Sequence, residues 1–111
     1  LTSLDVSKLD TSKVTDMSCM FRWCNGLTSL DLSNFDTSKV TNMRWMFGSC
    51  EGLTSLDLRN FDTSKTTDMQ EMFSSCSKLT KITVSNKWVV GSSTSTDGMF
   101  DNCGADHVTV V

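Results

Sequence analysis

Hydrophobic positions recur along this chain with a period of 26 residues. Leu1, Leu27, Leu53 and Leu79 each open a copy of one pattern, and the second and third copies are identical at 18 of 26 positions. A period between 20 and 50 residues is the signature of an array whose copies pack on one another. We therefore interpret residues 1–111 as a single domain made of copies 1–26, 27–52 and 53–78, a divergent copy 79–104 and a closing strand 105–111.

The first half of each copy predicts a β-strand. In the second copy, Leu30 and Leu32 are two residues apart and would point to one side of a strand, whereas Ser29, Asp31 and Ser33 would point to the other. Because the same register recurs in every copy, we expect the strands to align in one parallel sheet.

The second half of each copy has the spacing of a short helix. Val40, Met43, Met46, Phe47 and Cys50 would fall within an arc of roughly 120° on a helix. The serines and glycines of this segment have low helix propensity, so a 3₁₀ turn or a second strand remains an alternative. The predicted fold class is an α/β repeat solenoid with leucine-rich-repeat-like coils of 26 residues. One parallel β-sheet would lie opposite short helices or 3₁₀ turns.

A resemblance follows from these motifs. The L-x-x-L-x-L run at 27–32, followed by Asn34-Phe35 and then Met46-Phe47-x-x-Cys50, resembles the short leucine-rich repeats of BspA-like bacterial surface proteins. The DTSKVTNM…MF…C sequence also resembles the mycoplasma-type lipoprotein repeats of that group, and the resemblance covers residues 1–104. It implies an extracellular, cell-surface protein that serves in adhesion or protein binding, and it supplies no catalytic residues.

Composition narrows the function further. The net charge is −3 with both signs interspersed, which argues against nucleic acid as a partner. No apolar run is long enough for membrane insertion by this segment. A single histidine and the lack of a glycine-rich phosphate loop argue against an enzyme, and we expect no cofactor. Since the chain starts at the first residue of a copy, we interpret it as a fragment of a longer array with its signal and anchor elsewhere.

Four of the five cysteines occupy one position in successive copies. We expect this column to be buried and reduced, and we expect no metal site because only one histidine and no C-x-x-C pair are present. The fifth, Cys19, falls on the outward face of the predicted helix, where it invites self-association through an intermolecular disulfide. The column comprises Cys24, Cys50, Cys76 and Cys103.

Two surfaces are candidates for partner binding. On the outward helix face, Trp23 and Trp45 would project close together, with Arg22 and Arg44 nearby, and exposed Trp beside Arg is typical of interface hot spots. The partner would be a protein or glycan on a host or neighbouring cell. The competing interpretation is that one ring packs over the other and shields the core.

The open face of the predicted sheet is the alternative surface. It carries polar ladders that would serve a glycan, calcium ions or ordered water, as in ice-binding proteins. The ladder residues are Thr2, Ser3, Asp5, Thr28, Ser29, Asp31, Thr54, Ser55 and Asp57. A further alternative is a passive structural spacer, a stalk that needs no such surface. In the third copy, Thr66 replaces a buried valine and should be a weak spot unless its hydroxyl finds a backbone partner.

Overall fold

The computed structural model describes residues 3–111, so Leu1 and Thr2 lie outside the described residues. The chain forms strands β1 (Ser55–Leu58), β2 (Lys81–Val84) and β3 (Thr109–Val110). They make one parallel sheet in the order β1-β2-β3. Aligned residues are 26 apart in sequence, as are Leu58 and Val84 or Val84 and Val110.

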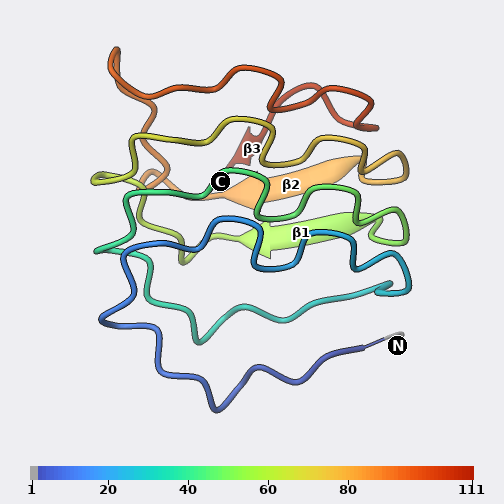
Figure 1. Cartoon of the computed structure of the whole chain (residues 1–111), viewed down its shortest axis with the longest axis horizontal. Coiled ribbons are helices and arrows are strands. Elements are labelled where there is room, and N and C mark those ends of the chain that lie inside the picture. The colour runs from blue at the N-terminus through green and yellow to red at the C-terminus, as the bar shows by residue number, and fades with distance from the viewer. Residues whose placement is uncertain (1–2) are drawn as a thin grey trace.

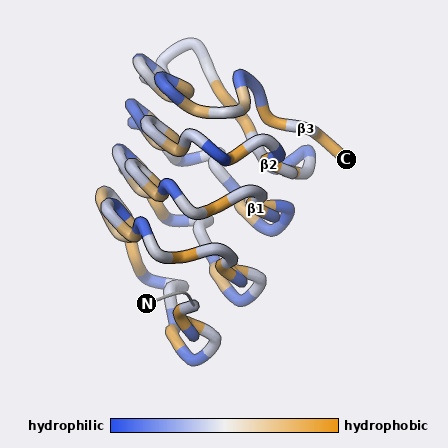
Figure 2. The backbone as a smooth tube through the Cα atoms, turned by 90° about the vertical axis from the view of Figure 1, so that its right-hand side faces the viewer, coloured by the Kyte–Doolittle hydropathy of each residue, from blue (hydrophilic) through white to orange (hydrophobic). Residues whose placement is uncertain are grey.

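Successive copies of the repeat lie one upon another as coils, which Figures 1 and 2 show from two directions. Isolated parallel bridges join Asp16 to Asn42, Asn42 to Asp68 and Asp68 to Ser95. The last step spans one residue more than the others, because the fourth copy carries an additional residue before its Met-Phe pair.

The predicted fold class, a leucine-rich-repeat-like α/β solenoid with helices or 3₁₀ turns opposite the sheet, is wrong. Residues 3–111 contain no α-helical or 3₁₀ segment, and their sheet has three strands. The segments expected to be helical are instead runs of consecutive turns. We call them turn segments: residues 16–23, 42–49, 68–75 and 95–102.

Backbone hydrogen bonds explain why these segments are not helices. A helix requires each amide to donate four residues back along the chain. Here the amide of Trp45 donates to the carbonyl of Gln70 (3.1 Å) and that of Phe47 to Met72 (2.9 Å), both in the next coil. The amides between them donate three residues back, as Met46 does to Met43 (3.2 Å). Every second amide therefore joins neighbouring coils.

Left-handed backbone conformations also interrupt any helix. Two residues in each turn segment, four apart, have positive φ, for example Trp45 (59°) and Ser49 (60°). This conformation costs a non-glycine residue roughly 1–2 kcal/mol. It recurs in every copy, so it belongs to the repeat and is not confined to one site. The full set is Cys19, Trp23, Trp45, Ser49, Glu71, Ser75, Gly98 and Asn102.

The sheet stops at β1, and the leucine runs of the first two copies are not strands among the described residues. Between β1 and residues 30–33 lies a pocket of about 680 Å³. The side chain of Asn60 bridges the two coils there by donating to the carbonyls of Leu32 (2.9 Å) and Phe35 (2.7 Å). Hydrogen bonds from the Asn60 side chain thus replace the expected strand pairing between the second and third coils.

A column of phenylalanine rings runs through the core. Phe47 stacks on Phe21 and on Phe73, each with ring centroids 5.7 Å apart, and Phe73 stacks on Phe100 at 5.8 Å. These are offset-stacking distances. Thr66, expected to be a weak spot, is 2% exposed and its hydroxyl donates to the carbonyl of Val40 (2.8 Å), so it has the partner it needs.

Candidate functional site

The turn segments present one compact group of aromatic and cationic side chains, which we call the tryptophan–arginine cluster: Arg22, Trp23 and Trp45. The guanidinium carbon of Arg22 lies 4.1 Å from the ring centroid of Trp45 and 4.9 Å from that of Trp23. Both distances are within the range of cation–π attraction. Arg22 therefore links the first coil to the second.

The two rings of the cluster differ in exposure. Trp23 is 64% exposed, whereas Trp45 is half-buried. Trp45 lies over Gly48, where a Cβ atom would come within 2.2 Å of the indole carbon Cε3. The glycine thus makes room for this ring, and only Trp23 offers a large free apolar surface.

The charge of Arg22 has no acidic partner within the described part of the chain. Its Nε atom is buried and makes no hydrogen bond to another described residue. A buried donor without a partner costs free energy.

Arg44, which the sequence placed beside these residues, is exposed and makes no cation–π contact with either ring of the cluster in the described structure. Its backbone amide donates a hydrogen bond to Oδ1 of Asn42 (2.9 Å). The structure thus brings together three of the four predicted partner-binding residues and leaves Arg44 outside.

The ladder residues Ser3, Asp5, Thr28, Ser29, Asp31, Thr54, Ser55 and Asp57 are all exposed, while Thr2 lies outside the described range. Their aspartates stabilise tight turns of the backbone. For example, Oδ1 of Asp31 accepts a hydrogen bond from the amide of Ser33 (3.0 Å). These local hydrogen bonds lower the pKa of Asp31 below its ordinary value. No group of three or more metal-ligating His, Cys, Asp or Glu side chains occurs in residues 3–111.

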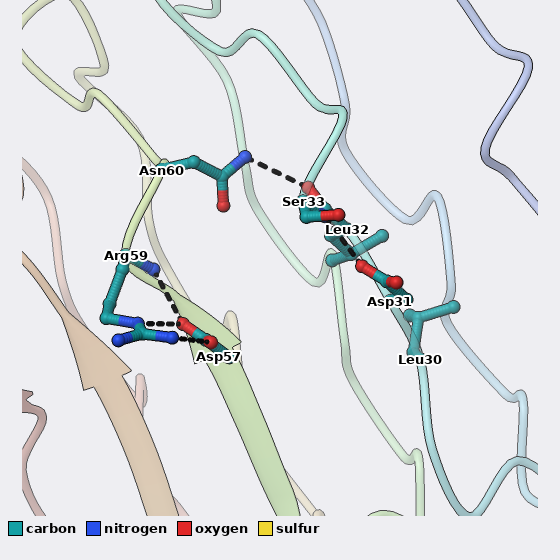
Figure 3. A pocket seen from close by; sticks show the side chains of 7 residues that line it. All are labelled: Leu30, Asp31, Leu32, Ser33, Asp57, Arg59 and Asn60. Carbon is teal, nitrogen blue, oxygen red and sulfur yellow. Dashed lines mark hydrogen bonds and ion pairs between the residues drawn. The ribbon is translucent and has the colours of Figure 1, made fainter.

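Asp57 is the member of the ladder with a charged partner. The guanidinium of Arg59 donates from Nε to Oδ1 (2.9 Å) and from the terminal nitrogen to Oδ2 (2.8 Å) of Asp57. Figure 3 shows this pair on one side of the pocket and Asp31 on the other. The pair lowers the pKa of Asp57. Since both side chains are mostly exposed, the pair contributes little to stability.

A second set of aspartates also stabilises tight turns through hydrogen bonds from the serine two residues on. The hydroxyl and amide of Ser38 donate to Oδ1 of Asp36 (2.6 and 3.0 Å). Asp10 accepts the same two bonds from Ser12, and Asp62 accepts the amide of Ser64 (3.0 Å). In the sequence, Asp10, Asp36 and Asp62 are each followed three residues later by a lysine, a spacing that suits helix capping and i,i+3 ion pairs. There is no helix to cap, and no aspartate–lysine ion pair forms among the described residues.

The cysteine column follows the turn segments. All five cysteines are free; Cys50 and Cys76 are buried, and Cys19 is exposed. The thiol of Cys50 donates to the carbonyl of Phe21 (3.0 Å), and that of Cys76 to Phe47 (2.9 Å). The interaction with Cys76 and burial raise the pKa of the Cys50 thiol. Such a thiol is a poor nucleophile.

Sequence reasoning missed one set of residues that the structure makes prominent. The hydroxyl of Thr37 donates to the carbonyl of Asp62 (3.0 Å) and accepts its amide (2.8 Å), thereby joining two coils through a side chain that is 1% exposed. Thr11 and Thr63 repeat this link. The recurring D-T-S-K sequence is the available signal, but the same residue types also suit a helix cap, so the sequence alone does not distinguish the two roles.

The chain thus stacks copies of a 26-residue pattern as coils, and the tryptophan–arginine cluster lies where the first coil meets the second. It belongs to the family DUF285, described as "Mycoplasma protein of unknown function", whose model matches residues 1–109. No curated protein and no solved structure matches the chain. The described residues include no helix that could cross a membrane.

Proposed function

We propose that this chain is a non-enzymatic binding module and that the tryptophan–arginine cluster is its partner-binding surface. The observation that carries this proposal is the pairing of an exposed indole, Trp23, with a guanidinium that has no acidic partner among residues 3–111. Trp and Arg are enriched among residues that dominate binding energy at interfaces. The cluster suits a protein segment that presents a carboxylate next to an aromatic or aliphatic side chain.

The competing structural role accounts for Trp45 better than for Trp23. Trp45 covers Gly48 and contacts Arg22, so it shields the junction of two coils. Trp23 leaves most of its surface in water, which a purely packing role does not require. In the third coil the corresponding places hold Ser74, Ser75 and Glu71, so the cluster is not part of the repeat and a passive spacer would not need it.

The likeness to BspA-like surface repeats and mycoplasma-type lipoprotein repeats supports the second part of the proposal, namely display on the outside of a bacterial cell. The partner would then be a protein on a host or neighbouring cell. A glycan is the alternative ligand, since indole rings also stack on sugars. Epitope accessibility on intact cells that produce the full-length protein tests display: antibody labelling without permeabilisation supports it, and labelling only after permeabilisation refutes it.

Binding is tested by selecting a displayed library of random peptides against the chain. Enriched peptides should carry a carboxylate close to an apolar residue. Their affinity should fall at least about tenfold in Trp23→Ala and in Arg22→Gln, since each removes a contact worth about 1.4 kcal/mol or more. Arg44→Gln is the matched control and should bind normally. Equal binding by all variants would refute the assignment, and failure to enrich any peptide would favour the spacer.

A further inference from the structure

The turn that follows the first turn segment holds an asparagine directly before a glycine. The backbone amide of Leu27 donates to the carbonyl of Cys24 (3.3 Å), so Asn25 and Gly26 occupy the two middle positions of a β-turn. Both residues are exposed. No other asparagine of the chain precedes a glycine. This pair is therefore chemically different from every other asparagine site in the chain.

The exposure of this turn is a property of the repeat. Glu51 and Ser77 occupy the place of Asn25 in the second and third coils, and they are exposed although a coil precedes each of them. The same turn closes there, because the amides of Leu53 and Leu79 also donate three residues back (3.4 and 3.1 Å). The exposure of Asn25 therefore does not depend on its place in the first coil.

The backbone nitrogen of Gly26 is not held by hydrogen bonding. Its amide donates to no other residue among residues 3–111, and the amides of Gly52 and Lys78, at the same place in the next two coils, donate to none either. Glycine has no Cβ atom, so its own side chain does not shield this nitrogen. A neighbouring side chain therefore has access to it.

The side chain of Asn25 is also free, in contrast to those of other asparagines. The side-chain nitrogens of Asn34 and Asn60 each donate to carbonyls of the preceding coil, and Oδ1 of Asn42 accepts a backbone amide. No hydrogen bond holds the side chain of Asn25 within the described part of the chain, in contrast to these three. Its amide carbon is thus free to approach the nitrogen of the next residue.

We propose that Asn25-Gly26 is a site of self-modification, at which the chain converts Asn25 to aspartate and isoaspartate without an enzyme. The backbone nitrogen of Gly26 attacks Cγ of Asn25, and its proton ends on the side-chain nitrogen, which leaves as ammonia. Water then hydrolyses the resulting cyclic imide. Opening at one carbonyl gives aspartate, and opening at the other gives isoaspartate, whose main chain runs through Cβ and Cγ. Either product replaces a neutral amide by a carboxylate.

The new charge lies next to the tryptophan–arginine cluster, and its effect on binding rests on the function proposed above. The amide of Asn25 donates to the carbonyl of Trp23 (2.8 Å), and Arg22 precedes Asn25 by three residues. Three residues span at most about 11 Å. Two like charges at about that distance in water change an affinity by about twofold. Modification should therefore weaken the binding of a carboxylate ligand at the cluster.

Incubation of the native chain at mildly alkaline and mildly acidic pH tests the modification itself. Peptide mapping by tandem mass spectrometry should find Asn25 converted at least about tenfold faster than Asn86, which is also exposed but precedes Lys87. Conversion should be faster at alkaline pH, because the nitrogen of Gly26 must lose a proton, and an isoaspartyl methyltransferase should methylate the product. The proposal is overturned if both asparagines convert equally fast, or if Asn25 converts only after the chain is unfolded.

The third coil supplies control substitutions that the repeat already tolerates. Gly26→Lys reproduces Lys78 and should slow the conversion of Asn25 at least about tenfold, because a side chain then crowds the attacking nitrogen. Asn25→Ser reproduces Ser77 and should abolish methylation at this turn. Thermal unfolding of both variants verifies that they fold. Conversion in folded Gly26→Lys at the rate of the native chain would overturn the proposal.

Asn25→Asp carries the charge of the product and tests the effect on the cluster. Peptides selected for a carboxylate should bind Asn25→Asp about twofold more weakly than the native chain at low salt, and the difference should shrink as salt is added. Asn25→Ser adds no charge and should bind normally. Equal binding by both variants would overturn this effect. If no peptide is selected at all, the proposed function fails, whereas mass spectrometry still decides whether Asn25 is modified.

Discussion

The buried threonine link between coils yields a sharp prediction. Thr37→Val keeps the size of the side chain but removes the hydroxyl that both donates to and accepts from the backbone of Asp62. The amide and carbonyl of Asp62 then lose their partners in a half-buried setting. At about 1–3 kcal/mol per unsatisfied group, reduced by partial access to water, we expect a loss of about 2–4 kcal/mol.

Thr66→Val is the matched control, because Thr66 is also buried but makes one side-chain hydrogen bond where Thr37 takes part in two. Valine is the residue found at this position in the first two copies, as Val14 and Val40. The carbonyl of Val14 accepts no hydrogen bond from any described residue, so the fold tolerates this carbonyl without a donor. A lost hydrogen bond is then offset by added apolar burial, and we expect a change within about 1 kcal/mol.

Thermal and urea unfolding of both variants measure the difference. A change of 1 kcal/mol corresponds to a Tm shift of about 4 °C for a domain of this size, so Thr37→Val should lower Tm by about 8–16 °C. Thr37→Ser restores the hydroxyl and should recover most of that loss. If Thr37→Val and Thr66→Val were equally destabilising, or if serine failed to rescue, the threonine link would contribute no more than ordinary packing.

Three further predictions concern single features of the surface. Gly48→Ala should displace the Trp45 ring and change its fluorescence. The free energy of unfolding should fall by less than about 1 kcal/mol, because other copies carry side chains at this position. Unchanged emission would contradict the contact between Trp45 and residue 48. Hydrogen bonds from Ser38 hold the pKa of Asp36 below its unfolded value of 3.8. The stability that these bonds contribute is therefore present above pH 3.8 and is lost as the pH falls below it, so Tm should decrease between pH 5 and pH 2.5. A constant Tm over this range would refute this prediction. Thiol titration should find Cys19 alone reacting quickly in the native chain and five thiols after denaturation, and Cys19→Ser should remove the fast group; two fast groups would contradict it.

The sequence identifies which side chains are buried better than it identifies the backbone that buries them. Val40, Met43, Met46, Phe47 and Cys50 all have no exposed surface, as their spacing predicted. That spacing was interpreted as a helix because steps of three and four residues match 3.6 residues per turn. Consecutive turns with i to i−3 hydrogen bonds produce the same steps, so periodicity alone could not distinguish the two.

The spacing of hydrophobic residues does not determine whether these segments form a helix or consecutive turns. Positive φ falls on residues as different as Trp45, Glu71 and Ser75, and only Gly98 and Asn102 among the eight are residues that favour it. Every second amide of these segments donates to a carbonyl 25 or 26 residues away, which is a property of stacking and not of local propensity. For the same reason, the sequence predicts that Trp23 and Trp45 lie on the same side of the stack, but it does not predict that Arg22 contacts both rings.

The most direct test of this fold measures hydrogen bonds across the coils in solution. Scalar couplings through hydrogen bonds in a ¹⁵N,¹³C-labelled sample identify the carbonyl that each amide contacts. The structure predicts couplings from the amide nitrogen of Trp45 to the carbonyl carbon of Gln70 and from Phe47 to Met72. Couplings from Phe47 to Met43, four residues back, would show a helix and contradict the stacked turn segments.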